Sequence, residues 1–377
     1  MPRRLLWSIL SGLLCVPLLA GAADEQPQGW IARILQVGAE GEGHEAAREA
    51  AIALQRCDAE ILPELITGLD AASPRALNWL RGVFETVAGR AQAAGTLSPQ
   101  WLAQVVHDRG HQPWTRSLAF QWWQRLAPAD AEKFLPQSVD DTAPEIRRAA
   151  VAWWIAQAQA SRSPDEARQR WRQALLGAVD DDQVKLIAQA LRQLGESVDL
   201  PRHFGFITRW QVIGPFENTM NVGFDTPYPP EHEWNLSATY AGKLGEVRWQ
   251  EVQTDHEYGI VDLAKALAPH KGALIYAAAE FPSADRQTVE IRLGTPNAWK
   301  LWVNGELVFA RDEYHRNMQL DQYAVRVQLQ PGINRILLKV CQNEQTEEWA
   351  QRWQYQLRVC DLSGRGLTPA GMATTQR

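Results

Sequence analysis

The sequence predicts a multidomain protein in which an N-terminal α-solenoid of paired helices precedes an antiparallel β-sandwich. Between residues 30 and 198, apolar residues recur at the three- and four-residue spacing of amphipathic helices. Between residues 204 and 367, short alternating segments are separated by Gly, Pro and Asn, which is typical of antiparallel strands. The helical period ends near Pro201, so we expect the domain boundary at residues 199–203.

Residues 1–22 are expected to form a secretory signal peptide. Arg3 and Arg4 precede an apolar run over residues 5–19, and Ala-Gly-Ala at 20–22 supplies a cleavage site of small residues. The run is short against the roughly 20 residues that a bilayer span needs. No later apolar run is long enough to cross a membrane, so we predict a periplasmic or secreted protein with no integral membrane span after cleavage.

Composition narrows the range of partners. The chain has 377 residues, 45% of them hydrophobic and 22% charged, which is ordinary for a globular protein. Its formal net charge of −6 gives no general attraction to phosphate backbones or anionic lipids, so no nucleic-acid partner is expected. After the expected signal peptide the chain keeps Cys57, Cys341 and Cys360, an odd number that argues against a disulfide framework.

The helical region contains a weak internal repeat. Asp recurs at positions 70, 108, 140 and 180, at intervals of 38, 32 and 40 residues, each time shortly before a new helix. Asp and Ser suit helix N-caps, and Pro suits the first turn. The arrangement resembles the HEAT-like repeat family, in which an Asp-containing turn precedes a second helix with Arg near its start; these arginines are Arg75, Arg116, Arg147 and Arg148. The resemblance covers residues 30–198 and implies an extended surface for a protein partner.

The strand region is clearest between residues 288 and 340. Apolar residues alternate with polar ones over 289–293 and over 325–329, as on a strand with one face in a core. Asn304-Gly305 lies between two apolar segments and predicts a type I′ hairpin. Pro331-Gly332 suits a turn, and the apolar run at 336–340 predicts a more fully buried strand.

Residues 204–367 also resemble the galactose-binding-like class of jelly-roll domains in exported bacterial proteins. The resemblance rests on Trp-Gln-Val-Ile-Gly-Pro-Phe at 210–216, on Phe-Asp-Thr-Pro-Tyr-Pro-Pro-Glu at 224–231, on the Asn-Gly hairpin and on the segment INRILLKV at 333–340. It implies a non-catalytic module that often binds glycans, and it allows a structural calcium ion. It carries over no defined ligand site. The tail at 368–377 is expected to be disordered.

Two loops combine the residue types that a glycan site needs. Such a site places an aromatic plane beside carboxylate, amide or guanidinium groups that bond to hydroxyls. The first candidate loop supplies Arg311, Asp312, Tyr314, His315, Arg316 and Asp321. The second candidate loop supplies Phe216, Asn218, Asp225, Tyr228 and Trp234. A polar loop is also what any β-sandwich presents to water, so a purely solvated loop is the alternative in both cases.

Signatures of catalysis and of cofactor binding are absent from the sequence. We find no Gly-x-Ser-x-Gly elbow, phosphate-binding loop, dinucleotide fingerprint or His-Glu-x-x-His motif. His107 and His111 have the spacing of a two-histidine metal face, but Gly110 makes a continuous helix there unfavourable. We therefore assign no catalytic residue, no metal ligand and no cofactor.

The sequence accordingly predicts an exported, non-catalytic binding or scaffolding protein. Its solenoid is expected to hold a protein partner, and its β-sandwich is expected to bind a carbohydrate or another envelope ligand. Two alternatives stay open. One is a carbohydrate-active hydrolase or esterase with an active site between the domains, and the other is a purely structural assembly protein.

Overall fold

The computed structural model of the chain describes residues 26–369, which combine α-helices with antiparallel sheets, so the expected mixture of helical and sheet structure is confirmed. The expected signal peptide at 1–22 lies outside the described residues, as does the expected tail beyond residue 369. Among the helices of residues 26–369, none has both the length and the apolar character required for a membrane span. The described residues form two compact units, which divide between Pro128 and Ala129.

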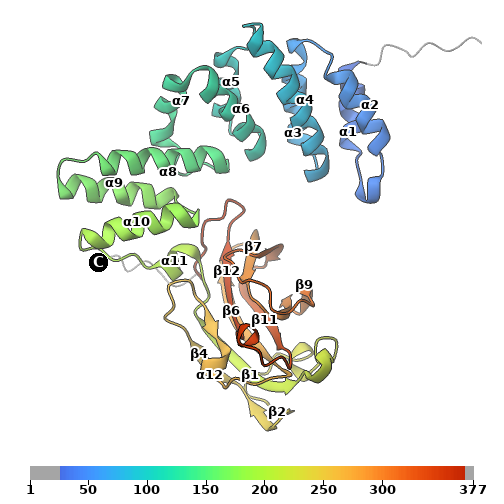
Figure 1. Cartoon of the computed structure of the whole chain (residues 1–377), viewed down its shortest axis with the longest axis vertical. Coiled ribbons are helices and arrows are strands. Elements are labelled where there is room, and N and C mark those ends of the chain that lie inside the picture. The colour runs from blue at the N-terminus through green and yellow to red at the C-terminus, as the bar shows by residue number, and fades with distance from the viewer. Residues whose placement is uncertain (1–25, 370–377) are drawn as a thin grey trace, which may run out of the picture. The chain divides into compact units, whose positions relative to one another are not determined.

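The first unit is helical throughout its regular structure (Figure 1). Its α-helices are α1 (Pro27–Leu35), α2 (His44–Leu54), α3 (Leu62–Ala71), α4 (Pro74–Ala93), α5 (Pro99–His107) and α6 (Pro113–Leu126). Proline stands in the first turn of five of them, where its missing N–H costs no hydrogen bond. The Ser73 and Ser98 hydroxyls accept hydrogen bonds from the first turns of α4 and α5 and so cap both helices.

The recurring Asp residues connect neighbouring turns. Oδ1 of Asp70 accepts a hydrogen bond from the backbone N–H of Gln112 at 2.9 Å, and Oδ2 lies 2.6 Å from Nδ1 of His111. The Trp114 indole donates to the carbonyl of Leu69 at 2.9 Å. Asp70 therefore joins the last turn of α3 to the turn before α6, which differs from the helix-capping role that the sequence suggested.

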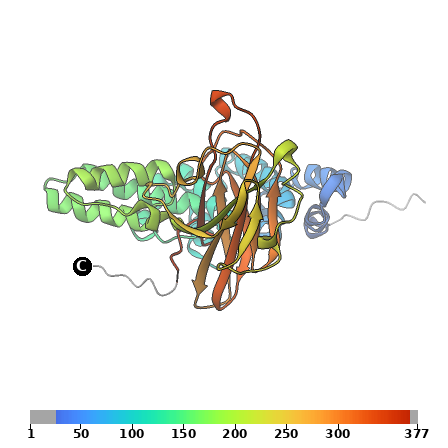
Figure 2. The same ribbon diagram turned by 90° about the horizontal axis from the view of Figure 1, so that it is seen from below.

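The second unit begins with four helices. They are α7 (Pro128–Phe134, starting at the boundary), α8 (Pro144–Gln159), α9 (Pro164–Gly177) and α10 (Asp181–Gln193). Helices α8, α9 and α10 lie side by side (Figures 1 and 2). The Arg148 guanidinium on α8 pairs with Asp180 at 3.1 Å and with Asp182 at 2.6 Å, which again ties two helical turns together.

The short helix α11 (Leu200–Phe204) leads into the sheets of the second unit. The larger sheet has six strands in the order β4-β1-β6-β11-β8-β9, and the smaller has four in the order β10-β7-β12-β5. The strands are β1 (Arg209–Glu217), β4 (Gln250–Gln253), β5 (Val261–Asp262), β6 (Ala273–Ser283), β7 (Gln287–Gly294), β8 (Ala298–Val303), β9 (Glu306–Arg311), β10 (Tyr323–Leu329), β11 (Gly332–Gln342) and β12 (Gln354–Cys360). All pairings within these sheets are antiparallel. A separate hairpin is formed by β2 (Thr239–Gly242) and β3 (Gly245–Arg248).

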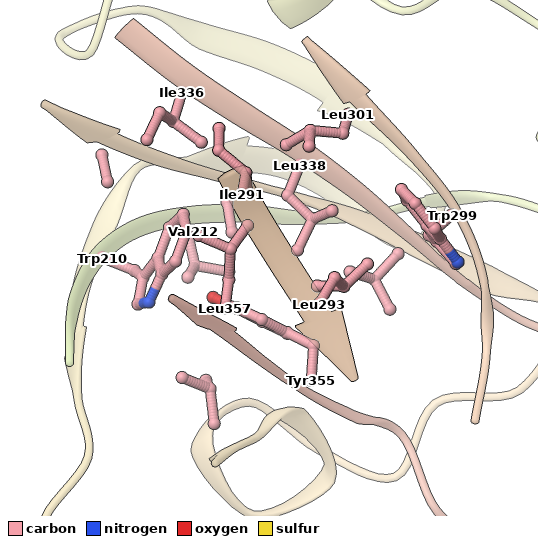
Figure 3. Packing of buried hydrophobic residues seen from close by; sticks show 14 of the residues in the cluster. Trp210, Val212, Ile291, Leu293, Trp299, Leu301, Ile336, Leu338, Tyr355 and Leu357 are labelled. Atoms are coloured by element: carbon pink, nitrogen blue, oxygen red, sulfur yellow. The ribbon is translucent and has the colours of Figure 1, made fainter. Parts of the chain in front are cut away.

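The main core lies between the two sheets (Figure 3). Alternate residues of the six-stranded sheet, among them Trp210, Leu301 and Leu338, meet Ile291 and Leu357 of the four-stranded sheet. Because successive side chains of a strand point to opposite faces, the other half of each strand in the six-stranded sheet points away from this core. We call that second surface the outer face.

Two turns were expected around this core. Asn304 and Gly305 both have positive φ, 52° and 85°, and connect the antiparallel pair β8–β9, which confirms the predicted hairpin. The chain also bends at Pro331, where it passes from β10 in the smaller sheet to β11 in the larger one. The three cysteines within the described residues, Cys57, Cys341 and Cys360, are free thiols.

Candidate functional site

The outer face of the six-stranded sheet carries a second apolar layer. It includes Ile213 of β1, Tyr276 and Ala278 of β6, Trp302 of β8 and Leu337 of β11. The segment 218–249, which follows β1 and precedes β4, packs on these residues through its own aromatic side chains; they are Phe224, Tyr228, Trp234, Tyr240 and Trp249. This segment covers part of the outer face, Ala310 and Tyr314 pack on the same layer, and Glu280 and Arg335 stay exposed.

A buried ionic group fastens the segment to the sheet. The fully buried ammonium of Lys339 on β11 lies 2.8 Å from Oε1 of Glu231 and donates to the carbonyls of Phe224 and Thr226 at 3.0 and 2.9 Å. The Tyr276 hydroxyl donates to the same Glu231 oxygen. Burial lowers the pKa of Lys339, and the Glu231 carboxylate offsets part of that effect. These contacts satisfy the buried charges and fix the position of residues 224–231.

Beside this anchor lies a pocket of about 440 Å³, which we call the first cavity. Its wall combines the indoles of Trp234 and Trp302, the carboxylates of Glu231, Glu233 and Glu280, the Arg335 guanidinium and the hairpin residues Asn304 and Gly305. Pockets of a few hundred cubic ångströms with apolar walls and a few polar groups are the usual form of small-ligand sites.

The polar groups of the first cavity differ in whether they already form hydrogen bonds within the protein. Glu231 is held by Lys339 and Tyr276, and Glu233 accepts a hydrogen bond from the Tyr240 hydroxyl at 2.7 Å. Burial, together with Glu233, raises the pKa of Tyr240 to about 12, so its hydroxyl stays protonated as the donor. The exposed carboxylate of Glu280 makes no hydrogen bond or ion pair within residues 26–369 and is available to a ligand.

Arg335 and Glu280 are opposite one another in the register of β11 and β6. Such a cross-strand pair ordinarily forms a salt bridge. Here the Arg335 guanidinium instead lies 5.4 Å from the centre of the Trp234 ring, as a cation on an aromatic face. The Glu280 carboxylate and the Arg335 guanidinium are thus neighbours on adjacent strands but are not paired with each other.

A second cavity of about 590 Å³ adjoins the first. It is lined by α11, by the start of β1 and by the end of β6, and its wall is largely apolar, with Trp210, Leu236, Phe281 and Leu367 among its residues. Trp234 and Glu280 line both cavities. The two cavities together form what we call the Trp234 groove.

The first candidate loop lies elsewhere, because none of its six residues lines either cavity. The Arg311 guanidinium covers the Phe309 ring, and Arg316 pairs with Glu313 at 3.1 Å. Nε2 of His315 donates a hydrogen bond to Oδ1 of Asn343 at 2.8 Å, and the His315 ring meets the exposed Trp349 ring edge-on. These side chains are largely engaged with one another and with their neighbours.

Asp321 from the same loop belongs to an ionic network inside the second unit. Its carboxylate accepts two hydrogen bonds from Arg358, at 2.7 and 2.6 Å, and one from Arg292 at 2.7 Å. Burial alone favours a raised pKa, but the two guanidinium groups hold the pKa of Asp321 below its ordinary value. This carboxylate joins β7 and β12 and is not open to a ligand.

Most residues of the second candidate loop are also buried or paired within the protein. Phe216 and Asn218 are fully buried, and Tyr228 packs on Phe216 and donates its hydroxyl to the carbonyl of Glu217 at 2.7 Å. Asp225 is exposed and pairs with Lys300 at 3.1 Å. Of the five residues in this loop, only Trp234 lines the groove.

The two predicted loops nevertheless meet each other. Nδ2 of Asn218 donates to the Tyr314 hydroxyl at 3.1 Å. Burial, followed by the neighbouring Asp225 carboxylate, raises the pKa of Asp312. The sequence therefore singled out two segments that are neighbours in space, although most of their polar groups bond internally.

A different cluster surrounds the ammonium of Lys243. It donates to Oε1 of Glu217 at 3.0 Å, to the Thr219 hydroxyl at 3.1 Å, to the carbonyl of Lys271 at 3.2 Å and to the carbonyl of Gly272. Hydrogen bonds from Thr219, with Lys243, lower the pKa of Glu217 to about 2. Within residues 26–369, no group of three or more His, Cys, Asp or Glu side chains is placed to hold a metal ion.

Sequence reasoning missed Glu280, Trp302 and Arg335. They lie on separate strands, at outer-face positions of β6, β8 and β11, so only the sheet order brings them together. One local signal was present: Glu280 follows the small, apolar run at 277–279 and interrupts a strand that is otherwise buried. A charged residue at such a position indicates that the sheet face is open there.

Comparisons with known proteins give little further information. No protein-family model matches the chain, and no curated protein is similar to it. Among solved structures, a GH31 alpha-xylosidase from Xanthomonas citri is 13% identical over 30% of this chain and 15% of its own, with a TM-score of 0.18. A beta-glucosidase from Kluyveromyces marxianus in complex with glucose is 11% identical over 78% of this chain and 33% of its own, with a TM-score of 0.27. At these TM-scores the likeness carries no argument.

Proposed function

We propose that this chain is an exported, non-catalytic binding protein whose sheets bind a carbohydrate in the Trp234 groove and whose helices hold a protein partner. We further propose that the helices form a HEAT-like solenoid and that the two sheets form a jelly-roll sandwich of the galactose-binding-like class. Contacts between successive turns support the first part, as between Asp70 and Gln112 or between Arg148 and Asp182. The core between two antiparallel sheets supports the second.

One observation carries the carbohydrate proposal. In the first cavity, the indole of Trp234 stands beside an uncommitted carboxylate, Glu280, and a guanidinium, Arg335. Sugars present apolar C–H faces that stack on aromatic rings, and their hydroxyls bond to carboxylate and guanidinium groups. The groove offers all three kinds of contact on a pre-formed sheet surface.

The proposal is tested by screening the full chain on a glycan array and in polysaccharide pull-downs, with and without calcium. Selective binding to a small group of related glycans is the expected result. The variant W234A should bind at least about tenfold more weakly, because buried aromatic anchors commonly carry most of the affinity. W349A removes another exposed indole outside the groove and should bind like the parent chain. Absence of any glycan binding by the folded chain would contradict the proposal.

Hydrolysis of a glycan is the second candidate, because three glutamates line the first cavity. Glycoside hydrolysis needs one carboxylic acid and one carboxylate on opposite sides of the scissile bond. Glu231 and Glu233 already accept hydrogen bonds from protein donors, which favours the binding role. Release of reducing ends from a bound glycan, lost in E280Q, would support the hydrolase instead.

The partner surface of the helices is proposed for the first unit. A shallow pocket of about 350 Å³ between α2 and α4 contains Trp79 and the half-exposed Ile52. A photo-reactive residue at position 52 should give a discrete covalent product in the exporting cell. The same residue at exposed Arg56, which is not part of this pocket, should not give that product.

Export itself is tested by the mature N-terminus. If residues 1–22 are a cleaved signal peptide, mass spectrometry of the protein from the cell envelope or medium should find Ala23 as its first residue. An uncleaved chain recovered from the cell interior would contradict this part of the proposal.

A further inference from the structure

The Trp234 groove is larger than one sugar ring requires. Its two cavities, about 440 and 590 Å³, each fall in the size range of a complete small-ligand site. They are adjacent, because Trp234 and Glu280 belong to the walls of both. A ligand that fills only one of them leaves a contiguous apolar surface in the other.

Trp234 stands at the junction of these cavities. Arg335 lines the first cavity alone and lies on the Trp234 ring, whereas Leu236 and Phe281 line only the second. The Trp234 indole therefore lies beside the Arg335 cation in the first cavity and beside apolar side chains in the second. Two neighbouring units of a chain could contact the same indole from the two cavities.

The charges along the groove are nearly balanced. Its lining contains four carboxylates (Asp199, Glu231, Glu233, Glu280) and three guanidinium groups (Arg202, Arg209, Arg335). Glu231 is already paired with Lys339. An anionic chain of uronic or sulfated sugars would meet Glu233 and Glu280 without an excess of cations to neutralise it. An uncharged chain needs only the hydroxyl contacts that these groups provide.

On these grounds, and resting on the proposed carbohydrate function, we propose that the groove binds an extended, uncharged oligosaccharide whose successive sugar units occupy the two cavities on either side of Trp234. Glu280 then accepts hydroxyl hydrogen bonds at the junction, and Arg335 supplies donors in the first cavity. A terminal monosaccharide would use only part of this surface.

Calorimetric titration of the full chain with cello-, xylo- and malto-oligosaccharides of one to six units tests the proposal. In the series that binds, affinity should rise by at least about tenfold between the monosaccharide and the tetrasaccharide, since each occupied cavity adds contacts. If the monosaccharide already binds as tightly as the tetrasaccharide, the proposal that the groove binds an extended chain is wrong. Tighter binding of oligogalacturonates than of any neutral series would overturn the charge argument.

Variants confined to one cavity give a second measure. R335A changes the first cavity and should weaken both short and long ligands if the shortest ones bind there. L236A changes the second cavity and should then lower the affinity for tetrasaccharides while leaving that for disaccharides unchanged. Effects that are the same at every ligand length in both R335A and L236A would contradict two successive subsites. Failure of every glycan to bind is a different result, because it rejects the proposed function itself.

Discussion

At the scale of single residues, Asp321 was predicted to contact a ligand, but its carboxylate bonds to arginines within the protein. Three hydrogen bonds from Arg292 and Arg358 occupy it, and Arg358 also donates to the carbonyls of Phe204 and Gly364. The loop at 311–321 has the composition of a ligand site. The short sequence of this loop does not show which of its polar groups bond within the protein. The partners of Asp321 lie on strands β7 and β12, which come from other parts of the sequence.

Replacing this carboxylate tests the assignment. D321N keeps the size of the side chain but leaves the buried Arg358 guanidinium without its anion, which typically costs about 3 kcal/mol or more, whereas Arg292 keeps its ion pair with Glu290. We expect a matching fall in the free energy of unfolding by chemical denaturation, with unchanged glycan binding. D225N removes a carboxylate that is 87% exposed and should leave stability almost unchanged. A normal stability of D321N would contradict the structural role.

The same residue predicts a dependence of stability on pH. The pKa of Asp321 is lowered in the folded chain from an ordinary value of 3.8, so its contribution is fully present above about pH 5. It is lost as the pH falls below 3.8 and through the folded-state pKa. The denaturation midpoint of the parent chain should therefore fall more steeply between pH 5 and pH 3 than that of D321N. Parallel curves would argue against the ionic network.

At the scale of an element, the segment 218–249 covers the outer face and carries Trp234. Lys243 within it is surrounded by oxygen atoms of Glu217, Thr219, Lys271 and Gly272. The ammonium thus occupies a position that an oxygen-coordinated cation could fill in another protein. The calcium ion allowed by the family resemblance is not needed here to neutralise Glu217.

This arrangement predicts the behaviour of K243A. Loss of the ammonium leaves Glu217 without its cationic partner, although Thr219 still donates to it, and removes the ammonium donor from the carbonyls, so we expect the melting temperature to fall by a few degrees. Millimolar calcium should recover part of that loss in K243A and have no effect on the parent chain. K265A, which changes an exposed lysine outside this cluster, serves as the control. Stabilisation of the parent chain by calcium would show a metal site that the structure does not indicate.

Local patterns predicted the strands better than the site. The alternation over 289–293 and the Asn304-Gly305 hairpin could be recognised from short stretches, because pleat and turn geometry are local properties. The place of β11 between β6 and β8 could not, because antiparallel partners come from distant parts of the chain. The groove depends on that order, so Glu280 and Arg335 were not predictable as a pair.

At the scale of the whole molecule, the sequence predicted helices followed by antiparallel strands, and the described residues have both. Among the candidate residues, Trp234 alone lies in the groove, while Asn218 and Tyr314 form a hydrogen bond with each other outside it. The central claim is therefore that ligand binding belongs to the outer face around Trp234 and not to the loop at 311–321.

One measurement compares these two locations directly. The full chain, W234A and the double variant Y314A/R316A are titrated with the glycan that binds the parent chain most tightly, after equal folding is checked by circular dichroism. The account predicts at least about a tenfold loss of affinity for W234A and less than about a twofold change for the double variant. Retained affinity in W234A with a loss in Y314A/R316A would place the site in the loop and contradict the account.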